Sequence, residues 1–310
     1  MDTYNKNFHY SKGSVMTDIK NVSVIGAGVL GAQIAFVVAH AGFKVTAWDI
    51  NDDAVEAAKG RFNSIGKSMI ADLDTASEES VAKAHENLSL TTDMEAAVAE
   101  ADIIIEAVPE KLDLKRCTWE KLGKAAPSHT IFCTNTSSLL GSEIADASGD
   151  PKRFINTHFA NRVWVKNIVE IMPNPETDLK YRDIVEEFAH EADLAPVVLK
   201  KEQRAYLLNT MMVPFLQAAQ YLYVNDVADV DQIDKDWRIS MSTEMGPFEI
   251  MDMIGMRSIV NVAEGSGEDQ PEWKKKFTEI AKQMIEEGRS GQGDGEGFYK
   301  YDDNGNKIEK

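Results

Sequence analysis

Short apolar runs alternate with amphipathic segments through the N-terminal part of the chain. The apolar runs are rich in β-branched and aromatic residues and occur at 22–25, 44–48, 102–108, 130–134, 154–159 and 167–172. Runs of this length predict buried strands, and the stretches at 32–41 and 112–125 have the composition of helices. The first strand, helix and strand span about 30 residues, which is typical of parallel strands joined by a crossover helix. This part of the chain therefore predicts an α/β fold with a doubly wound sheet.

The pattern changes after Glu202, where apolar residues recur at helical spacing instead of in strand-like runs. This spacing predicts helices at 206–224, 231–242, 247–255 and 272–287, with Pro214 bending the first of them. A charged cluster at 200–204 separates the two patterns. We therefore predict a Rossmann-type nucleotide-binding domain at 19–201, followed by an all-helical domain at 202–310.

The remaining segments are polar or rich in glycine. Residues 1–18 show no apolar periodicity and predict a flexible tail, whereas the acidic segment 52–100 predicts mostly helix. The glycine-rich segment 288–297 predicts a loop.

The amino-acid composition of the chain argues against some classes of binding partner. The 310 residues carry a formal net charge of −18, and a chain this acidic is poorly suited to nucleic acid or to an anionic membrane surface. No apolar stretch reaches the roughly 18 residues that a membrane helix needs, and residues 1–20 lack the apolar centre of a secretory signal. The two cysteines, Cys117 and Cys133, suit free thiols in a reducing compartment and have no metal-ligand spacing. We expect a cytoplasmic enzyme without a metal that acts on a small molecule.

A glycine-rich turn follows the first predicted strand and opens the first helix. Gly26, Gly28 and Gly31 have the spacing of a dinucleotide fingerprint, and Asp49 follows Gly28 by 21 positions at the end of the next strand. In such a turn the three glycines allow the tight bend, the close approach of the pyrophosphate and the close packing of the helix. Asp49 would accept hydrogen bonds from the ribose and repel a 2′-phosphate, which favours NAD over NADP. The same turn also occurs in FAD-binding proteins and in turns without a nucleotide.

Two polar residues stand out at the later strands. His158 lies near the end of one apolar run, and Glu170 lies in the middle of the next. A carboxylate between isoleucine and valine needs a partner, and a histidine on a neighbouring strand supplies one. Such a carboxylate orients the imidazole and stabilises its protonated form, so that the histidine can accept a proton from a hydroxyl group. The alternatives are a core histidine and a carboxylate at a strand edge.

Two further residues are candidates for contacts with the substrate. Ser137 follows a predicted strand, and the carboxyl ends of strands in an open α/β sheet face the cofactor crevice. Asn209 interrupts an apolar helix, where a buried amide requires hydrogen-bond partners. The alternatives are ordinary turn chemistry for Ser137 and a structural link between the domains for Asn209.

The chain resembles the 3-hydroxyacyl-CoA dehydrogenases over nearly all of residues 22–301. The matching segments are 26–31 (GAGVLG), 106–110 (EAVPE), 135–139 (NTSSL), 158–161 (HFAN), 169–170 (VE), 209 with 213–215 (VPF), 245–249 (MGPFE) and 295–299 (GEGFY).

The resemblance implies a role for each matching residue. It implies that His158 is the catalytic base and that Glu170 orients it. Ser137 and Asn209 would position the substrate. The cofactor would be held by NAD-contacting residues in the glycine turn and beyond it, namely Gly26, Gly28, Val29, Leu30, Gly31, Asp49, Glu110, Lys115 and Asn161. The resemblance also implies a homodimer formed through the helical C-terminal domain.

Three segments depart from the family pattern. Arg162 stands where the family usually has proline, residues 291–294 lack the usual lysines, and the segment 72–79 is acidic. Since CoA carries several phosphate charges, it would need a cluster of Arg61, Lys67 and Lys83. These departures leave open a dehydrogenase of free 3-hydroxy acids, of the gulonate or carnitine kind, in which Arg162 or Lys166 meets the substrate carboxylate. A non-catalytic NAD-binding protein is a third possibility.

Overall fold

The computed structural model describes residues 17–265, 267, 269–302 and 305–308. The chain divides into two compact units, one ending at Leu207 and the other beginning at Leu208, and each is described here by itself. The predicted tail at 1–18 lies outside the described residues except for Thr17 and Asp18. Thr17 donates hydrogen bonds to Glu191 through its main-chain N–H at 2.6 Å and its hydroxyl at 2.7 Å.

The first unit is built on one sheet of eight described strands. The strands are β1 (Asn21–Ile25), β2 (Lys44–Trp48), β3 (Leu88–Thr91), β4 (Ile103–Glu106), β5 (Ile131–Thr134), β6 (Phe154–Phe159), β7 (Ile168–Pro173) and β8 (Ala195–Val198). Their order in the sheet is β3-β2-β1-β4-β5-β6-β7-β8, and every neighbouring pair is parallel except β6–β7. The order reverses between β1 and β4, which is where an open α/β sheet binds its ligand.

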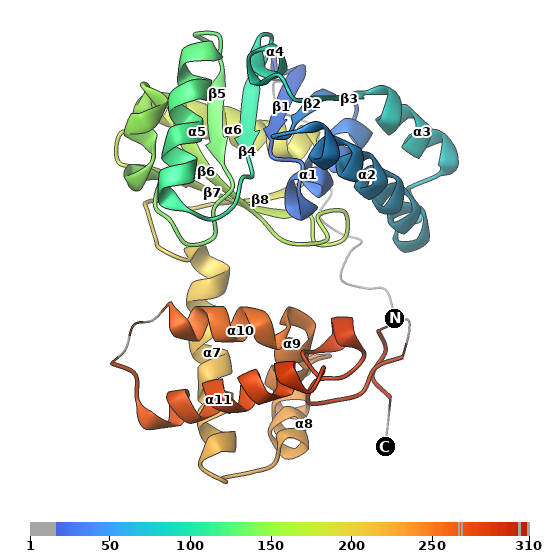
Figure 1. The fold of residues 1–310 in the computed structure, drawn as a ribbon, viewed down its shortest axis with the longest axis vertical. Helices are drawn as coiled ribbons and strands as arrows, with labels where there is room; N and C mark the ends of the chain where they lie inside the picture. Colours follow the sequence, from blue (N-terminus) through green and yellow to red (C-terminus); the bar gives the residue numbers. More distant parts are fainter. Residues whose placement is uncertain (1–16, 266, 268, 303–304, 309–310) are drawn as a thin grey trace. The chain divides into compact units, whose positions relative to one another are not determined.

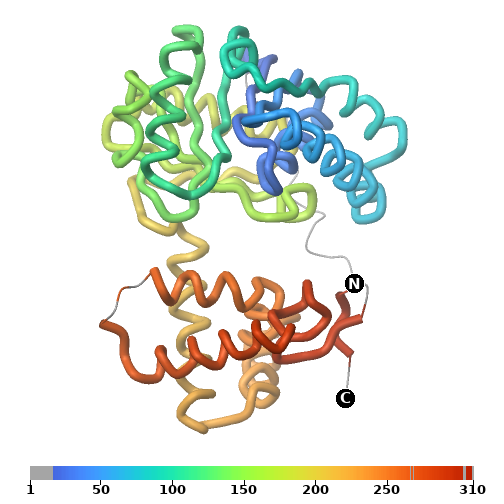
Figure 2. Tube along the Cα trace, in the orientation of Figure 1, coloured from blue at the N-terminus to red at the C-terminus, as the bar shows by residue number. Residues whose placement is uncertain are grey.

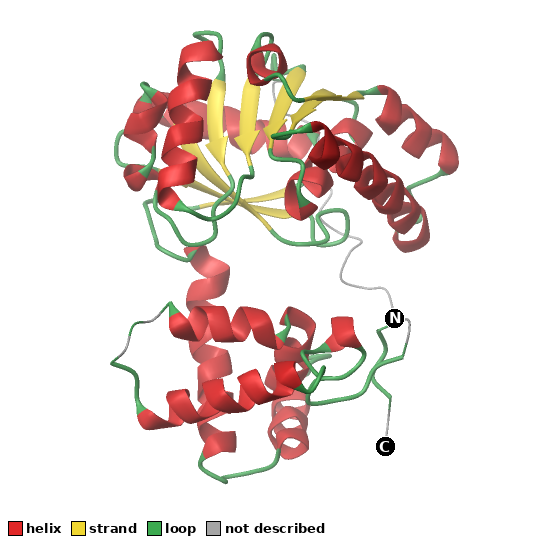
Figure 3. Cartoon of the chain, viewed as in Figure 1, coloured by secondary structure: helices red, strands yellow, loops and turns green. Residues whose placement is uncertain are grey.

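Helices cover both faces of this sheet (Figures 1 and 3). They are α1 (Val29–His40), α2 (Asp52–Asp72), α3 (Glu78–Glu86), α4 (Met94–Val98), α5 (Leu112–Ala125) and α6 (Leu179–Glu191). Helices α1, α2, α3 and α6 share one hydrophobic core, whereas α4 and α5 belong to a second one. Strand β4 serves both cores, since Ile103 and Ile105 face the first and Ile104 faces the second. This alternation buries both faces of a parallel strand and explains why its sequence is a continuous apolar run.

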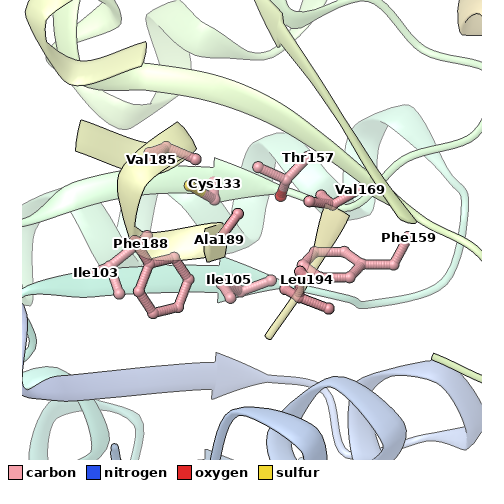
Figure 4. A pocket seen from close by; sticks show the side chains of 10 residues that line it. All are labelled: Ile103, Ile105, Cys133, Thr157, Phe159, Val169, Val185, Phe188, Ala189 and Leu194. Carbon is pink, nitrogen blue, oxygen red and sulfur yellow. The ribbon is translucent and has the colours of Figure 1, made fainter. Parts of the chain in front are cut away.

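A small cavity lies between the sheet and α6 (Figure 4). Its volume is about 10 Å³, and its lining is apolar apart from Thr157 and Cys133. Burial raises the pKa of the Cys133 thiol, so this cysteine remains protonated and unreactive. A space of this size holds at most one water molecule. The cavity is a packing gap in the core, and the functional site has to be found elsewhere.

The second unit is helical. Helix α7 (Tyr206–Val224) begins at the end of the first unit and continues into the second, where α8 (Val230–Met241), α9 (Pro247–Ile254), α10 (Met256–Glu264) and α11 (Glu272–Glu286) follow. Helices α10 and α11 pack side by side (Figure 2). The core of the unit includes Phe248, Met251 and Phe277. Asp252 ties the segment after α11 to α9, because its carboxylate accepts the main-chain N–H groups of Phe298 and Tyr299.

The structure confirms the predicted doubly wound sheet followed by a helical C-terminal part. The sequence patterns missed β3, α6, β8 and α10. Strand β3 is a half-buried edge strand of four residues inside a polar region, so its apolar signal is weak. The predicted loop at 288–297 contains a short 3₁₀ helix, Gln292–Asp294. The domain limits at 201 and 202 remain a prediction.

Candidate active site

The glycine turn lies between β1 and α1, beside the end of β4. Gly26 adopts φ +96°, a conformation that side chains rarely tolerate, and a Cβ there would lie 2.9 Å from the carbonyl oxygen of Ala107. A Cβ on Gly31 would lie 1.8 Å from the carbonyl oxygen of Gly26. The first and third glycines are therefore required by the turn itself.

The open side of the turn fits a phosphate group. A Cβ on Gly28 would meet nothing within 4 Å, so the main chain is accessible at this position. Gly28 is also the N-cap of α1, and within the described residues no side chain caps this helix end. The first turn of α1 carries Val29, which is 65% exposed, and the half-buried Leu30. An uncapped helix N-terminus with accessible main chain binds anions well, and these residues fit the pyrophosphate of a dinucleotide.

Asp49 lies beside the glycine turn, where the fingerprint requires an acidic residue. Its Oδ2 accepts the main-chain N–H of Ala27 at 3.0 Å, and its Oδ1 accepts that of Ile50 at 2.7 Å. From α2, the Arg61 guanidinium donates to the carbonyl oxygen of Ala27 at 3.1 Å. A carboxylate and a guanidinium thus both hold the main chain of the turn.

His158 and Glu170 form a cross-strand pair. They lie opposite each other in the antiparallel register of β6 and β7, so their side chains are on the same face of the sheet. His158 Nδ1 lies 3.0 Å from Glu170 Oε2, and the Glu170 carboxylate is almost completely buried. A carboxylate can only accept a hydrogen bond, so the His158 nitrogen that faces it must carry the proton. The neutral imidazole therefore has its proton on Nδ1, and Nε2 is free to act as a hydrogen-bond acceptor.

The turn after β5 places a hydroxyl group against this acceptor. Ser137 Oγ lies 3.2 Å from His158 Nε2. Glu110 supports the turn, because its Oε1 accepts the main-chain N–H groups of Ser137 at 2.9 Å and Ser138 at 2.8 Å and the Thr136 hydroxyl at 2.5 Å. Burial acts to raise the pKa of Glu110, but the hydrogen bonds from Thr136 and Ser138 and the charge of Lys115 outweigh it and lower the pKa. Glu110 therefore holds the turn as a carboxylate.

Lys115 is completely buried and occupies the centre of a polar network. Its Nζ lies 2.8 Å from Glu106 Oε1 and 3.6 Å from Glu110 Oε2, and it donates to the carbonyl oxygen of Asn135 at 3.1 Å. The Glu106 carboxylate also accepts the hydroxyl of Thr134 at 2.6 Å. The Lys115 ammonium is enclosed by protein acceptors, whereas the Glu110 side chain is 37% exposed. A direct contact of Lys115 with the cofactor stays a prediction.

Asn161 lies in the loop after β6 and contacts the first helix. Its Oδ1 accepts the side-chain amide of Gln33 at 2.8 Å and the main-chain N–H of Arg162 at 3.0 Å. Beyond it, the Arg162 guanidinium lies 2.9 Å from Asp72, and the Trp164 indole donates to the same carboxylate at 2.8 Å. The loop is thus tied to α1 and α2, and Arg162 is already paired within the protein.

The structure brings His158, Glu170, Ser137 and Glu110 into one hydrogen-bonded constellation. Asn209 lies on α7 in the second unit, so its role as a substrate-positioning residue stays a prediction. Sequence reasoning missed Gln33, which contacts Asn161, and Tyr206, whose ring is stacked on the His158 imidazole. Gln33 is a lone amide in an Ala/Val-rich helix, which is a detectable signal, whereas nothing in the sequence distinguishes Tyr206 from an ordinary core residue. Within the described ranges there is no cluster of residues that could hold a metal ion.

Comparisons with known proteins show which family the chain belongs to. The family model described as the NAD binding domain of 3-hydroxyacyl-CoA dehydrogenase matches residues 21–203, and the model of its C-terminal domain matches residues 206–301. The mitochondrial hydroxyacyl-coenzyme A dehydrogenase of Homo sapiens is 32% identical over 288 residues, which cover 91% of each chain. A probable 3-hydroxybutyryl-CoA dehydrogenase of Bacillus subtilis is 30% identical and covers 92% of this chain and 99% of its own.

Solved structures are also similar. A diketoreductase that acts on dicarbonyl compounds is 43% identical, with a TM-score of 0.88, and covers 92% of this chain and 100% of its own. The (S)-3-hydroxybutyryl-CoA dehydrogenase of Ralstonia eutropha is 26% identical, with a TM-score of 0.79 and coverage of 92% and 99%. The two family models together span the sheet, the glycine turn and the helical unit, and this chain belongs to the 3-hydroxyacyl-CoA dehydrogenase family.

Proposed function

We propose that this NAD-dependent oxidoreductase interconverts a 3-hydroxyacyl-CoA and the 3-oxoacyl-CoA, with His158 as the general base. The observation that carries the proposal is the hydrogen-bonded series from Glu170 through His158 to Ser137, with contacts of 3.0 and 3.2 Å. NAD supplies the hydride acceptor, and the residues of the chain bind, orient and move the proton. Family membership and the relatives that act on CoA thioesters support the choice of substrate.

In the direction of oxidation, His158 Nε2 accepts the proton of the 3-hydroxyl group while the C3 hydrogen leaves as hydride. The Glu170 carboxylate at Nδ1 stabilises the imidazolium that forms. The Ser137 hydroxyl, which contacts Nε2, is placed to hydrogen-bond the same substrate oxygen and to support its developing negative charge. In the reverse direction the protonated His158 donates to the ketone oxygen. In that direction C3 receives the hydride, so that the ketone becomes the 3-hydroxyl group.

A direct assay tests the proposal. Purified protein, NADH and acetoacetyl-CoA are mixed, and the loss of NADH absorbance is followed. We expect turnover that saturates with acetoacetyl-CoA. The absence of turnover at high enzyme concentration would eliminate the thioester as substrate.

A free dicarbonyl compound is the second candidate substrate. The diketoreductase structure is more similar to this chain than the CoA-dependent relatives described above, with 43% against 26–32% identity. Arg61, a candidate for the CoA phosphates, donates to a carbonyl oxygen of the glycine turn, whereas Arg162, the candidate for a substrate carboxylate, is paired with Asp72. Acetylacetone with NADH in the same assay, and free 3-hydroxybutyrate with NAD followed as NADH formation, discriminate between the two: activity only on thioesters eliminates the free-acid and dicarbonyl alternatives.

The position of Asp49 leads to a prediction about cofactor preference. Asp49→Asn keeps the size of the side chain and one of its two acceptor oxygens but removes the negative charge that repels a 2′-phosphate. We expect the ratio of NADPH to NADH affinity to rise about tenfold, since like charges at about 4 Å repel by about 1–4 kcal/mol near a protein surface. Fluorescence titration with both cofactors measures this ratio. Asp74→Asn, an exposed position between α2 and α3, is the control, and an unchanged ratio in Asp49→Asn would show that Asp49 does not discriminate.

We further propose that the second unit forms a homodimer in solution. Large apolar side chains are exposed on its helices, including Met211 on α7 and Ile239 and Met241 on α8. Exposed apolar groups on several helices of one unit are typical of an interface. Sedimentation analysis measures the oligomeric state, and a monomer at micromolar concentration would rule out the homodimer.

The location that we propose for the protein is the cytoplasm. A separate finding is that the helices of the described residues include none with the length and apolar character of a membrane span.

A further inference from the structure

The imidazole of His158 is in contact with a second aromatic ring. The Tyr206 ring is stacked on it, with centroids 4.6 Å apart and planes inclined by 19°. Tyr206 is the first residue of α7 and is completely buried. The stack covers one face of the ring, whereas the contacts to Glu170 and Ser137 involve its two nitrogens. The two kinds of contact therefore restrain different motions of the imidazole.

The phenol ring is itself anchored to the strand that carries His158. Its hydroxyl oxygen accepts a hydrogen bond from Asn156 Nδ2 at 3.0 Å. Asn156 precedes His158 by two positions in β6, so both side chains are on the same face of the strand. The Tyr206 side chain therefore spans two neighbouring positions on this face, with its hydroxyl at one and its ring at the other. Burial raises the pKa of the Tyr206 phenol, which stays neutral at physiological pH.

The next residue of α7 contacts the other member of the pair. The main-chain N–H of Leu207 donates to Glu170 Oε1 at 2.9 Å, while Glu170 Oε2 faces His158. At the start of the helix, Tyr206 thus contacts His158 and the next residue, Leu207, contacts Glu170. Ala205 and Tyr206 adopt φ +66° and φ +56°, which are unfavourable for residues other than glycine. Such a backbone conformation persists where surrounding contacts hold it. Here the contacts that hold it are those with His158, Asn156 and Glu170.

We infer that Tyr206 is a positioning residue for His158, an inference that rests on the proposed function. The hydrogen bond to Glu170 fixes one atom of the imidazole but leaves the ring free to tilt about that bond. The stacked phenol fixes the plane of the ring and keeps Nε2 directed at the position of the reacting oxygen. Because Tyr206 acts through His158, its loss lowers kcat and leaves the binding of cofactor and substrate unchanged.

Two variants of Tyr206 and a matched control test this role. Tyr206→Leu removes the ring, whereas Tyr206→Phe keeps the ring and removes only the hydroxyl group that contacts Asn156. We expect kcat to fall about tenfold in Tyr206→Leu, with both KM values within about twofold of the parent, and we expect phenylalanine to restore most of the rate. Tyr181→Leu makes the same substitution at a half-buried position of α6 and should leave kcat unchanged. An unchanged kcat in Tyr206→Leu, or an equal loss in Tyr206→Phe, would refute the role of the ring.

A spectroscopic measurement needs neither turnover nor a Tyr206 variant that folds. A stacked phenol shifts the proton resonances of the imidazole upfield through its ring current. The chain has six histidines, and the His158 signals are assigned by their loss in His158→Gln. We expect upfield His158 signals in the parent, and signals at ordinary positions would overturn the inference. Upfield signals without turnover on any substrate would retain the positioning of His158 and reject the proposed reaction.

Discussion

Replacing His158 with glutamine should lower kcat about 1000-fold, within the range that general-base catalysis contributes. Glutamine retains a side chain that forms hydrogen bonds and is similar in length, but it cannot accept the proton of the 3-hydroxyl group. Because the glycine turn and Asp49 are separate from the substitution, the KM for NADH should stay within about twofold. Steady-state rates in both directions measure the effect.

His129→Gln is the matched control for this substitution. His129 is exposed and lies 3.3 Å from Asp102, so it forms a histidine–carboxylate contact outside the site. Its replacement should leave kcat unchanged. A kcat for His158→Gln within tenfold of the parent would mean that another group accepts the proton, and the catalytic assignment would be wrong.

Among the proposed substitutions, replacing Lys115 with methionine should cause the largest loss in the free energy of unfolding. Methionine fills a similar volume but leaves the Glu106 carboxylate buried without its counter-charge at 2.8 Å. Breaking a buried ion pair by removing one partner typically lowers the free energy of unfolding by about 3–5 kcal/mol. For a unit of this size we expect the Tm to fall by about 10 °C, measured by thermal unfolding in the absence of cofactor.

Two further variants isolate the cause of this loss. Lys121→Met makes the same substitution at an exposed position of the same helix and should change the Tm by less than about 2 °C. Glu106→Gln combined with Lys115→Met removes both charges and should be more stable than Lys115→Met alone, because no uncompensated charge remains. A double variant no more stable than Lys115→Met alone would disprove the contribution of the ion pair.

The buried pair also explains how the fold maintains the site. Glu106 ends β4 and accepts the Thr134 hydroxyl at the end of β5, while Lys115 joins α5 to the main chain that follows β5. Glu110 extends this network to the turn that carries Ser137. The position of the Ser137 hydroxyl is therefore linked, through hydrogen bonds, to the stability of the sheet. We expect Lys115→Met to lower activity in molecules that remain folded.

Much of the fold could be predicted because its signals are local. The runs at 44–48 and 154–159 coincide with β2 and β6, and the helix at 112–125 coincides with α5. The elements that were missed have weak or interrupted signals. Helix α10 begins directly after Gly255, which also ends α9, so the pattern of a new helix is not separated from that of the preceding one. Strand β8 has four half-buried residues and includes a proline.

The amino-acid sequence by itself determined the glycine turn and its acidic partner and singled out a histidine and a carboxylate as candidates for a pair, because these signals depend on residue type and on spacing along one or two adjacent elements. Only the tertiary structure decided which groups surround that pair. The antiparallel register of β6 and β7 places Glu170 opposite His158, and the start of α7 brings Tyr206 and Leu207 to them from a separation in sequence of more than 30 residues. The structure likewise placed Lys115 inside the protein with Glu106. Contacts of this kind follow from how distant elements pack, and no local pattern of apolar and polar residues encodes them.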